Sequence, residues 1–282
     1  MGKLITRIGV LVLSIIAITL VLSQDVKAGV NVDVDGSTAV ISWDGKGKAE
    51  VVGKLIPNSL DAHTILDKVS DEVENVIIDK SIKTIGNYAF YECGNIKSVT
   101  IPNSVKSIGD NAFYKCYRIK SIQIPNSVKS IGDAAFEFCT GLTSIKIPNS
   151  VKSIGQHAFS ECINLTDITI SNSVKSIELW TFGGCENLTS IKIPNSVKSI
   201  GGSAFNCCFN LASVKIPNSV KSIETWAFYS CRNLKSITIP NSVKFIEKDA
   251  FKFCDEITIK CKKGSYAHKY AKKNKIKYKI IK

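Results

Sequence analysis

A block of 23 residues recurs along this chain without an insertion, and it restricts the possible folds more than any other feature. Numbered from its first Ser, one copy reads SVKSIGDNAFYKCYRIKSIQIPN, Ser104 to Asn126. Seven copies are complete and an eighth is shortened. A fixed period of about 20–50 residues is the signature of a solenoid. Because each unit contacts only its neighbours in such folds, the sequence predicts one continuous array of stacked coils.

The pattern inside each repeat predicts one strand and a buried column of side chains. Apolar residues occupy positions 2, 5, 9, 10, 13, 16, 19 and 21. Ile122 and Ile124 alternate with the polar residues Ser121 and Gln123, as in a half-buried strand. Pro at position 22 ends that strand, since it has no N–H to donate. Gly at position 6, as in Gly109, predicts a tight bend.

Positions 10 and 13 hold Phe and Cys in every copy, and we predict that both form the core. The phenylalanines are Phe90, Phe113, Phe136, Phe159, Phe182, Phe205, Phe228 and Phe251. The cysteines are Cys93, Cys116, Cys139, Cys162, Cys185, Cys208, Cys231 and Cys254. Structural zinc sites need clustered ligands rather than one Cys per coil, so packing is the favoured interpretation of the cysteines. Disulfides between adjacent coils remain geometrically possible. Cys207 and Cys261 lie outside this column.

Both ends of the chain differ from the repeats. Residues 1–28 combine Lys3 and Arg7 with an apolar run and a small-x-small site, as in a secretory signal peptide. An uncleaved membrane anchor is the alternative, although the apolar run is short for a span. The predicted organisation is a β-rich cap with an incomplete leading repeat at 29–80, the solenoid at 81–261 and a helix-strand cap at 262–282.

The charge of the chain favours anionic partners. The formal net charge is +13, and residues 1–28, which hold three basic residues and one acid, leave +11 for the rest. Wall polymers, acidic glycans and membrane surfaces fit this balance. Export argues against nucleic acid as a partner. We expect a secreted or loosely surface-associated protein with no integral membrane span after signal cleavage, and the oligomeric state stays open.

The clearest candidate site is position 3, which holds Lys in all eight copies. These residues, here named the lysine row, are Lys83, Lys106, Lys129, Lys152, Lys175, Lys198, Lys221 and Lys244. Stacked coils would space them by about 5 Å, so the row is suited to a linear polyanion. The alternative is that repeat duplication preserved a solubilising lysine along a stacked edge.

The second candidate is the outward side of the predicted strand, positions 18 and 20, here named the strand face. Position 18 contributes Ser98, Ser121, Ser144, Asp167, Ser190, Ser213 and Ser236. Position 20 contributes Thr100, Gln123, Lys146, Thr169, Lys192, Lys215 and Thr238. This repetitive surface suits an extended ligand better than a compact one. It equally suits no ligand.

Two smaller features have competing interpretations. The aromatic residues Tyr88, Trp180 and Trp226 at position 8 either stack on sugars or pack at the rim, and packing is favoured. Asn164 and Asn187 begin N-L-T sequons, which matter only in a eukaryotic host.

No residues predict catalysis, a metal site or a cofactor. His63, His157 and His268 lie about a hundred residues apart and share no nucleophile, so a triad or metal site is not expected. The sequence also has no Gly-rich phosphate loop. We therefore do not expect an enzyme.

The repeats share the motif AF-x-x-C-x-x-L-x-x-I-x-I-P-x-SV-x-x-IG, which stays in phase through eight copies from about Asn75 onward. This motif resembles the BspA-like leucine-rich repeats of bacterial secreted and surface proteins. The resemblance implies an α+β leucine-rich repeat solenoid with caps at both ends. It also implies a non-enzymatic role in adhesion or host-protein binding, and the strand face is a common binding surface of such proteins. The alternatives are an electrostatic binder of anionic wall or matrix polymers and a structural spacer.

Overall fold

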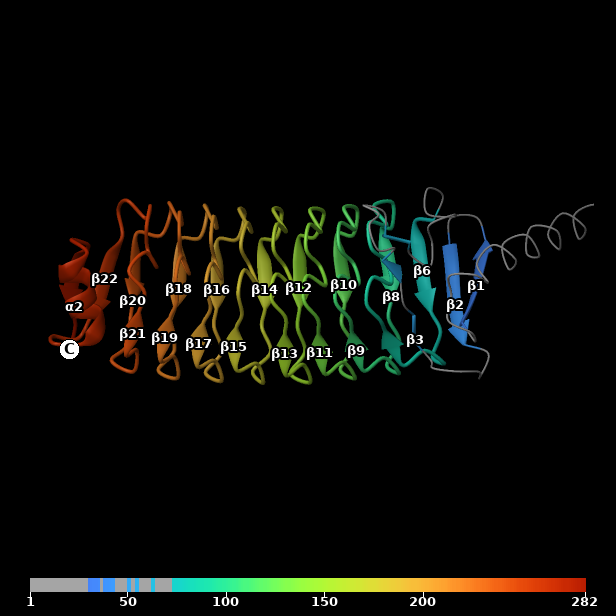
Figure 1. The fold of residues 1–282 in the computed structure, drawn as a ribbon, viewed down its shortest axis with the longest axis horizontal. Helices are drawn as coiled ribbons and strands as arrows, with labels where there is room; N and C mark the ends of the chain where they lie inside the picture. The colour runs from blue at the N-terminus through green and yellow to red at the C-terminus, as the bar shows by residue number, and fades with distance from the viewer. Residues whose placement is uncertain (1–29, 36–37, 44–49, 52–53, 56–61, 64–72) are drawn as a thin grey trace, which may run out of the picture.

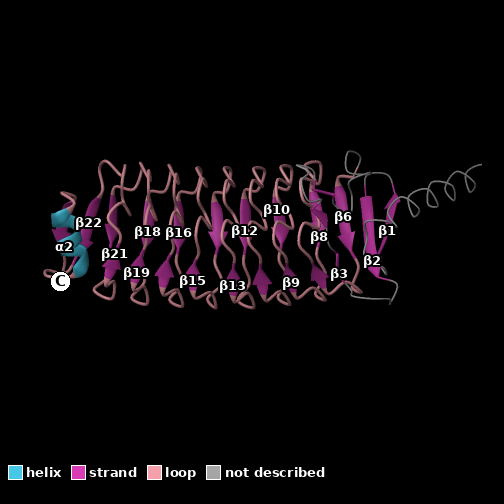
Figure 2. Cartoon of the chain, viewed as in Figure 1, coloured by secondary structure: helices cyan, strands magenta, loops and turns pink. Residues whose placement is uncertain are grey.

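The computed structural model describes residues 30–35, 38–43, 50–51, 54–55, 62–63 and 73–282, with side chains from Val73 onward. Its coils stack side by side into an elongated array, and the C-terminus lies at one end (Figure 1). Each repeat contributes two short strands joined by turns (Figure 2). The prediction of a repeat solenoid is confirmed. The signal peptide predicted for residues 1–28 lies outside the described residues.

The first row of strands occupies positions 18–20, where one strand per repeat was predicted. It comprises β8 (Ser98–Thr100), β10 (Ser121–Gln123), β12 (Ser144–Lys146), β14 (Asp167–Thr169), β16 (Ser190–Lys192), β18 (Ser213–Lys215) and β20 (Ser236–Thr238). Neighbours pair in parallel, with Ile122 opposite Ile145 and Ile145 opposite Ile168. The central residue of each strand is therefore held on the buried side.

A second row of strands, which the sequence pattern did not predict, occupies positions 4 and 5. It comprises β7 (Thr84–Ile85), β9 (Ser107–Ile108), β11 (Ser130–Ile131), β13 (Ser153–Ile154), β15 (Ser176–Ile177), β17 (Ser199–Ile200), β19 (Ser222–Ile223) and β21 (Phe245–Ile246). Pairing is again parallel, as between Ile131 and Ile154. Two-residue strands are too short to show an alternating pattern, so this row becomes visible only from the stacking.

Additional strands lie at the two ends of the array. β1 (Val30–Asp35) pairs antiparallel with β2 (Thr38–Trp43), and β2 pairs in parallel with β6 (Asn75–Ile78). β3 (Glu50–Val51) continues the second row, and β4 (Lys54–Leu55) pairs antiparallel with β5 (Ala62–His63). The first row continues at the other end through β22 (Thr258–Cys261) to β23 (Lys277–Ile280), all four of whose residues are exposed.

A short helix, α2 (Tyr266–Lys273), connects the last two strands. The Ser265 hydroxyl accepts a hydrogen bond from the His268 N–H, as an N-cap residue does. Ala267, Tyr270 and Ala271 are buried against the last coil. In the described part of the chain this is the one helix, so the solenoid is built mostly of strands and turns rather than as an α+β array. Among the described residues, no helix is long and apolar enough to cross a membrane.

The last repeat is shortened by one residue. Residues 257–259 have the same Ile-Thr-Ile pattern as the strand of the preceding repeat, and matching the two patterns predicts a strand that arrives three residues early. In the structure Ile259 lies opposite Ile237, 22 residues earlier. Ile257 remains at position 16, where its N–H donates to the Cys254 carbonyl in the way that Leu142 donates to Cys139. The prediction from the pattern is therefore wrong by two residues.

The remaining side of each coil is a series of turns with left-handed backbone at two positions. Position 12 has a positive φ in every repeat, from Glu92 at 57° to Phe253 at 60°, and position 8 has one from Tyr88 to Trp226. This geometry points alternate N–H groups at the next coil. Phe90 donates to Ala112 at 2.7 Å and Glu92 to Tyr114 at 2.7 Å. The turn side therefore has its own hydrogen-bond ladder, which satisfies backbone groups that would otherwise be buried unpaired.

The phenylalanine column forms the centre of the core. All eight rings are buried, and consecutive centroids lie 5.1–5.7 Å apart with interplanar angles of 1–16°. Burying one such side chain contributes about 1.5–3 kcal/mol. The stack therefore sets both the rise per coil and much of the stability.

The hydrogen-bonded rows are interrupted between the fourth and fifth repeats, a boundary here named the seam. One sheet ends at β14 and the next begins at β16; in the second row β13 and β15 likewise belong to different sheets. Among described residues the Lys175 N–H does not bond the Lys152 carbonyl, whereas the other neighbouring pairs at this position do so at 2.7–2.8 Å. A further break in the first row separates β8 from β10.

Position 6 is a point of close approach between coils before the seam. A Cβ on Gly109, Gly132 or Gly155 would lie only 2.5–2.6 Å from backbone atoms of the preceding repeat, so glycine allows this close approach. Position 6 holds Glu in the fifth, seventh and eighth repeats. The second row continues through β19 and β21 of the seventh and eighth repeats, so the residue at position 6 does not by itself account for the seam.

Candidate binding surfaces

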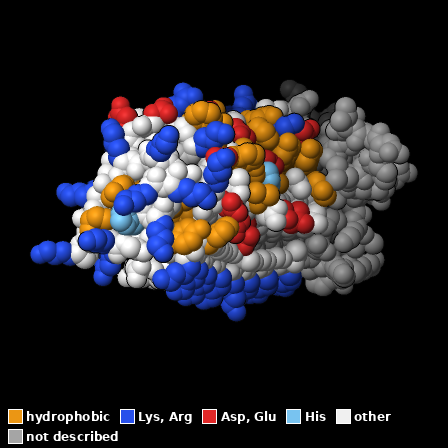
Figure 3. All heavy atoms as spheres, turned by 60° about the vertical axis from the view of Figure 1, so that its left-hand side comes forward, with side chains coloured by type: hydrophobic (Ala, Val, Ile, Leu, Met, Phe, Trp, Pro, Cys, Tyr) orange, Lys and Arg blue, Asp and Glu red, His pale blue; other side chains and the backbone are white. Residues whose placement is uncertain are grey.

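The lysine row lies along one long edge of the array, at the turns between the two rows of strands. All eight side chains are exposed. Figure 3 shows Lys and Arg side chains gathered in a continuous band along one edge. Within the described part of the protein none of the eight forms an ion pair; Lys83 and Lys244 donate only to backbone carbonyls. The array thus presents a line of unneutralised ammonium groups.

The strand face is exposed from β8 to β20. In β8, β10, β12, β14, β16 and β18 both outer residues are exposed and the central one is buried. β20 differs only in that Ser236 is half-buried. The strand face is therefore a narrow, polar surface with three cationic side chains, Lys146, Lys192 and Lys215.

A hollow of about 490 Å³ lies at the end of the strand face in the first three repeats. Its walls include Gln123 and Lys146 from the strand face and the Pro-Asn turns at Pro102, Pro125 and Asn126. The strand face is therefore hollowed where its strands run into these turns.

The position 8 aromatics lie on the turn side, away from both surfaces. Trp180 stacks on His157 with centroids 6.0 Å apart, and Tyr88 packs at 5.7 Å from Tyr91. Trp226 contacts Tyr229 at 6.2 Å and keeps 45% of its surface exposed. These contacts are those of rim packing.

The cysteine column is buried and reduced. From Cys116 to Cys254 each thiol donates to the Phe carbonyl of the preceding coil at 2.9–3.2 Å. Burial raises the pKa of the six column thiols from Cys116 to Cys231, that of Cys139 to about 12. Cys261 is also buried, and Cys207 is half-exposed. The neutral thiol of each ladder cysteine is thus used as a hydrogen-bond donor inside the core.

The histidines are not brought together. His157 lies 3.4 Å from a Glu137 carboxylate oxygen, and His268 accepts a hydrogen bond from the Gly264 N–H in the cap. The side chain of His63 lies outside the described part. In that part no group of three His, Cys, Asp or Glu side chains is arranged to hold a metal ion.

Asn164 and Asn187 belong to a ladder of exposed amides at position 15. The Asn187 amide donates to Asn164 at 3.3 Å, Asn210 to Asn187 at 3.2 Å and Asn233 to Asn210 at 3.0 Å. The two sequon asparagines are therefore exposed but already take part in hydrogen bonds between coils.

Two hollows lie where sequence reasoning found no site. One, of about 520 Å³, lies over the second row, where Gly201 and Gly202 leave space beside Glu178 and Glu224. The other, here named the cap pocket, lies between the eighth repeat and α2. Both hollows could have been found in the sequence as departures from the repeat. For the first, these are Glu at position 6 (Glu178 and Glu224) and the Gly201-Gly202 pair; for the cap pocket, it is Phe245, where the other copies have Ser or Thr.

Comparison with known proteins identifies the class of protein that this fold represents. The family model described as BspA type leucine rich repeat region matches six copies, over residues 68–188 and 152–275. The chain therefore belongs to the BspA-type leucine-rich repeat family. No curated protein shows significant similarity to this chain.

Among solved structures, a leucine-rich repeat protein from Bacteroides ovatus is 26% identical, with a TM-score of 0.62 over 84% of this chain and 70% of that one. A leucine-rich repeat protein from Eubacterium ventriosum is 23% identical, with a TM-score of 0.53 over 84% of this chain and 71% of the other. The second likeness concerns the fold alone.

Proposed function

We propose that this protein is a non-enzymatic, exported binding module that attaches to an extended anionic polymer of a cell wall or extracellular matrix. The observation that carries the proposal is the lysine row, with eight exposed side chains and no ion pair to a described carboxylate. Export rests on the signal peptide predicted for residues 1–28. Family membership supports a binding role of this kind.

Electrostatics favours a linear polyanion as the partner. Two ammonium groups about 5 Å apart repel by about 0.8 kcal/mol in water. Neutralisation by a polymer with regularly spaced charges removes this repulsion at every coil, and it releases counterions from the polymer. Binding should therefore weaken steeply as the salt concentration rises.

Adhesion to a protein ligand through the strand face is the second candidate. Its support is the exposure of positions 18 and 20 over seven strands, at which Ser236 alone is half-buried. A protein partner bound there would lose little affinity in salt and would not require the lysine row.

Retention on immobilised heparin across a salt gradient tests the proposal. We expect elution well above physiological ionic strength, and loss of retention when the lysine row is changed to Gln. Two charge-matched variants provide the control: one changes three row lysines, Lys106, Lys129 and Lys152, to Gln, and the other changes the three lysines exposed at position 17, which are Lys97, Lys120 and Lys235. Elution at or below physiological ionic strength would leave the row as a solubilising surface. Equal losses in both variants would indicate a response to net charge alone.

A further inference from the structure

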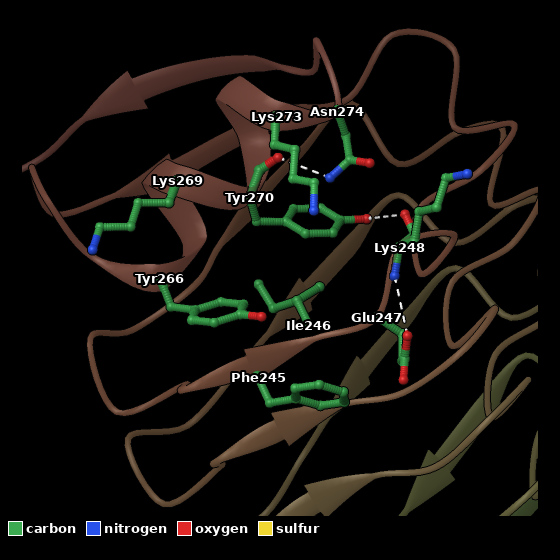
Figure 4. Close-up of a pocket in the computed structure, with 9 residues that line it drawn as sticks. All are labelled: Phe245, Ile246, Glu247, Lys248, Tyr266, Lys269, Tyr270, Lys273 and Asn274. Atoms are coloured by element: carbon green, nitrogen blue, oxygen red, sulfur yellow. Dashed lines mark hydrogen bonds between the residues drawn. The ribbon is translucent and has the colours of Figure 1, made fainter.

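The cap pocket is a hollow of about 350 Å³ between β21 and α2 (Figure 4). In Figure 4 the Phe245, Ile246 and Tyr266 side chains lie together on one side, below Tyr270 and Lys273. Phe245 and Tyr266 remain 43% and 39% exposed, although Ile246 is buried. Two partly exposed aromatic rings therefore line the pocket.

Phe245 is not required by the fold at its position. The same position holds Ser or Thr in the seven other repeats, where the residue lies at the surface of the second row. A large apolar side chain in an exposed position costs solubility without contributing to the core. The substitution therefore indicates a role at the surface, next to the cap.

The rest of the pocket is rigid and polar. The Tyr270 hydroxyl donates to the Lys248 carbonyl at 2.9 Å, and the Asn274 amide donates to the Tyr270 carbonyl at 2.9 Å. Lys273 descends from α2 on the pocket side and Lys269 extends outward, while the Glu247 carboxylate lies at the opposite wall (Figure 4). Cationic donors and one acceptor therefore surround the two aromatic rings.

The pocket also adjoins the C-terminal end of the lysine row. Lys244, the last member of the row, directly precedes Phe245 in the chain. A polymer that follows the row toward the C-terminus would reach the cap pocket next.

From this arrangement we propose that the cap pocket binds one acidic sugar unit, a pyranose bearing a carboxylate or sulfate, of the glycan that the lysine row contacts. The apolar faces of the sugar lie against Phe245 and Tyr266, since aromatic faces attract the polarised C–H groups of a sugar ring. Lys273 pairs with the anionic group and Glu247 accepts from a ring hydroxyl. This inference rests on the proposed function, because the sugar unit belongs to the polymer that the lysine row is proposed to bind. Binding in the cap pocket is tested separately.

The wall chemistry favours a sugar over an acidic peptide. An aromatic or aliphatic peptide side chain would cover the two rings but would add no donor for the Glu247 carboxylate, which in the structure accepts from the Lys248 N–H at 3.4 Å. A hydroxylated ring supplies donors around its edge and an apolar face at the same time.

The probe for the test is a heparin-derived tetrasaccharide, too short to span the lysine row, titrated by calorimetry at one salt concentration. Phe245→Ser restores the residue of the other repeats and should fold normally. We expect it to weaken tetrasaccharide binding about tenfold, which corresponds to about 1.4 kcal/mol. Lys273→Gln should weaken it by a similar factor. Phe253→Ser, at an exposed aromatic of the same repeat on the turn side, is the matched control and should bind as the unaltered protein does.

The outcomes separate this inference from the proposed function. A variant with Gln at Lys83, Lys106, Lys129, Lys152, Lys175, Lys198 and Lys221 should lose long heparin but keep the tetrasaccharide within about threefold. If Phe245→Ser and Lys273→Gln bind the tetrasaccharide normally, the pocket inference is wrong even if the row binds heparin. Equal affinity for neutral maltotetraose, or displacement by tetraglutamate, would also overturn it. If the seven-lysine variant keeps long heparin, the proposed function fails instead.

Discussion

The close stacking before the seam predicts opposite effects for the same substitution at two glycines. In Gly155→Ala the new Cβ would meet the Asp133 side-chain oxygen and would lie 2.5 Å from the Asp133 backbone nitrogen. Because the atom that this Cβ meets belongs to the backbone of the preceding coil, the third and fourth coils must move apart. In Gly202→Ala the nearest atom is the flexible Leu179 Cδ1 at 3.2 Å.

The magnitudes follow from these distances. Overpacking at Gly155 costs about 1–3 kcal/mol, and reduced freedom of the unfolded chain offsets about 0.4–1 kcal/mol. We expect a net loss of about 1–2 kcal/mol for Gly155→Ala. Gly202→Ala should be neutral or should gain up to about 1 kcal/mol, since its φ is not positive.

Urea unfolding followed by circular dichroism measures the free energy of unfolding of both variants. Amide hydrogen exchange in β11 and β13 shows where the backbone hydrogen bonds are weakened. Protection should fall on both sides of Gly155 and should be unchanged around Gly202. If Gly155→Ala is as stable as the unaltered protein, or if both variants lose equally, the steric role of glycine in the stacking of the fourth coil on the third is refuted.

Three further predictions concern the core and the turn side. Phe159→Ala removes a buried ring that stacks at 5.4 and 5.7 Å on its neighbours, and it should lose about 3–5 kcal/mol in urea unfolding; a loss below about 1 kcal/mol would contradict the role of the column. Iodoacetamide at pH 8 should label only Cys207 in the native protein, as read by mass spectrometry, because the nine other cysteines are buried; rapid labelling of Cys139 would contradict this. Burial, with a smaller contribution from Glu186, raises the pKa of Glu161. Since the folded form then holds its proton to a higher pH than the unfolded form, a stability penalty is present at pH 7 and absent below about pH 4. Glu161→Gln should therefore be more stable than the unaltered protein at pH 7 but not at pH 3.5, and an equal difference at both pH values would exclude the charge effect.

The repeat predicted most of the architecture because its apolar positions are identical in copy after copy. Ile122 and Ile145 occupy the same environment, so one strand inferred from sequence fixes all of them. The second row could not be predicted in the same way. Ser130 and Ile131 form a strand because equivalent residues stack in register, and two residues show no periodicity by themselves.

The candidate sites were predictable only where every copy agrees. The lysine row is visible in the sequence because Lys recurs at one position. The cap pocket depends on a single departure, Phe245, whose effect depends on the space between the last coil and α2. Left-handed backbone at Glu92 and Trp180 was equally hidden, because hydrogen bonding to the next coil overrides the ordinary preference of these residues.

Each coil of the array pairs with the next through the backbone edge of its strands. The outer edge of β23 has no following strand in the described structure, so a second copy of the chain could pair with it there. Lys277 and Lys279 lie on that edge, exposed beside Tyr278 and Ile280. Two such edges facing each other would bring four ammonium groups together. We therefore expect the last strand to resist edge-to-edge pairing with a second copy of the chain.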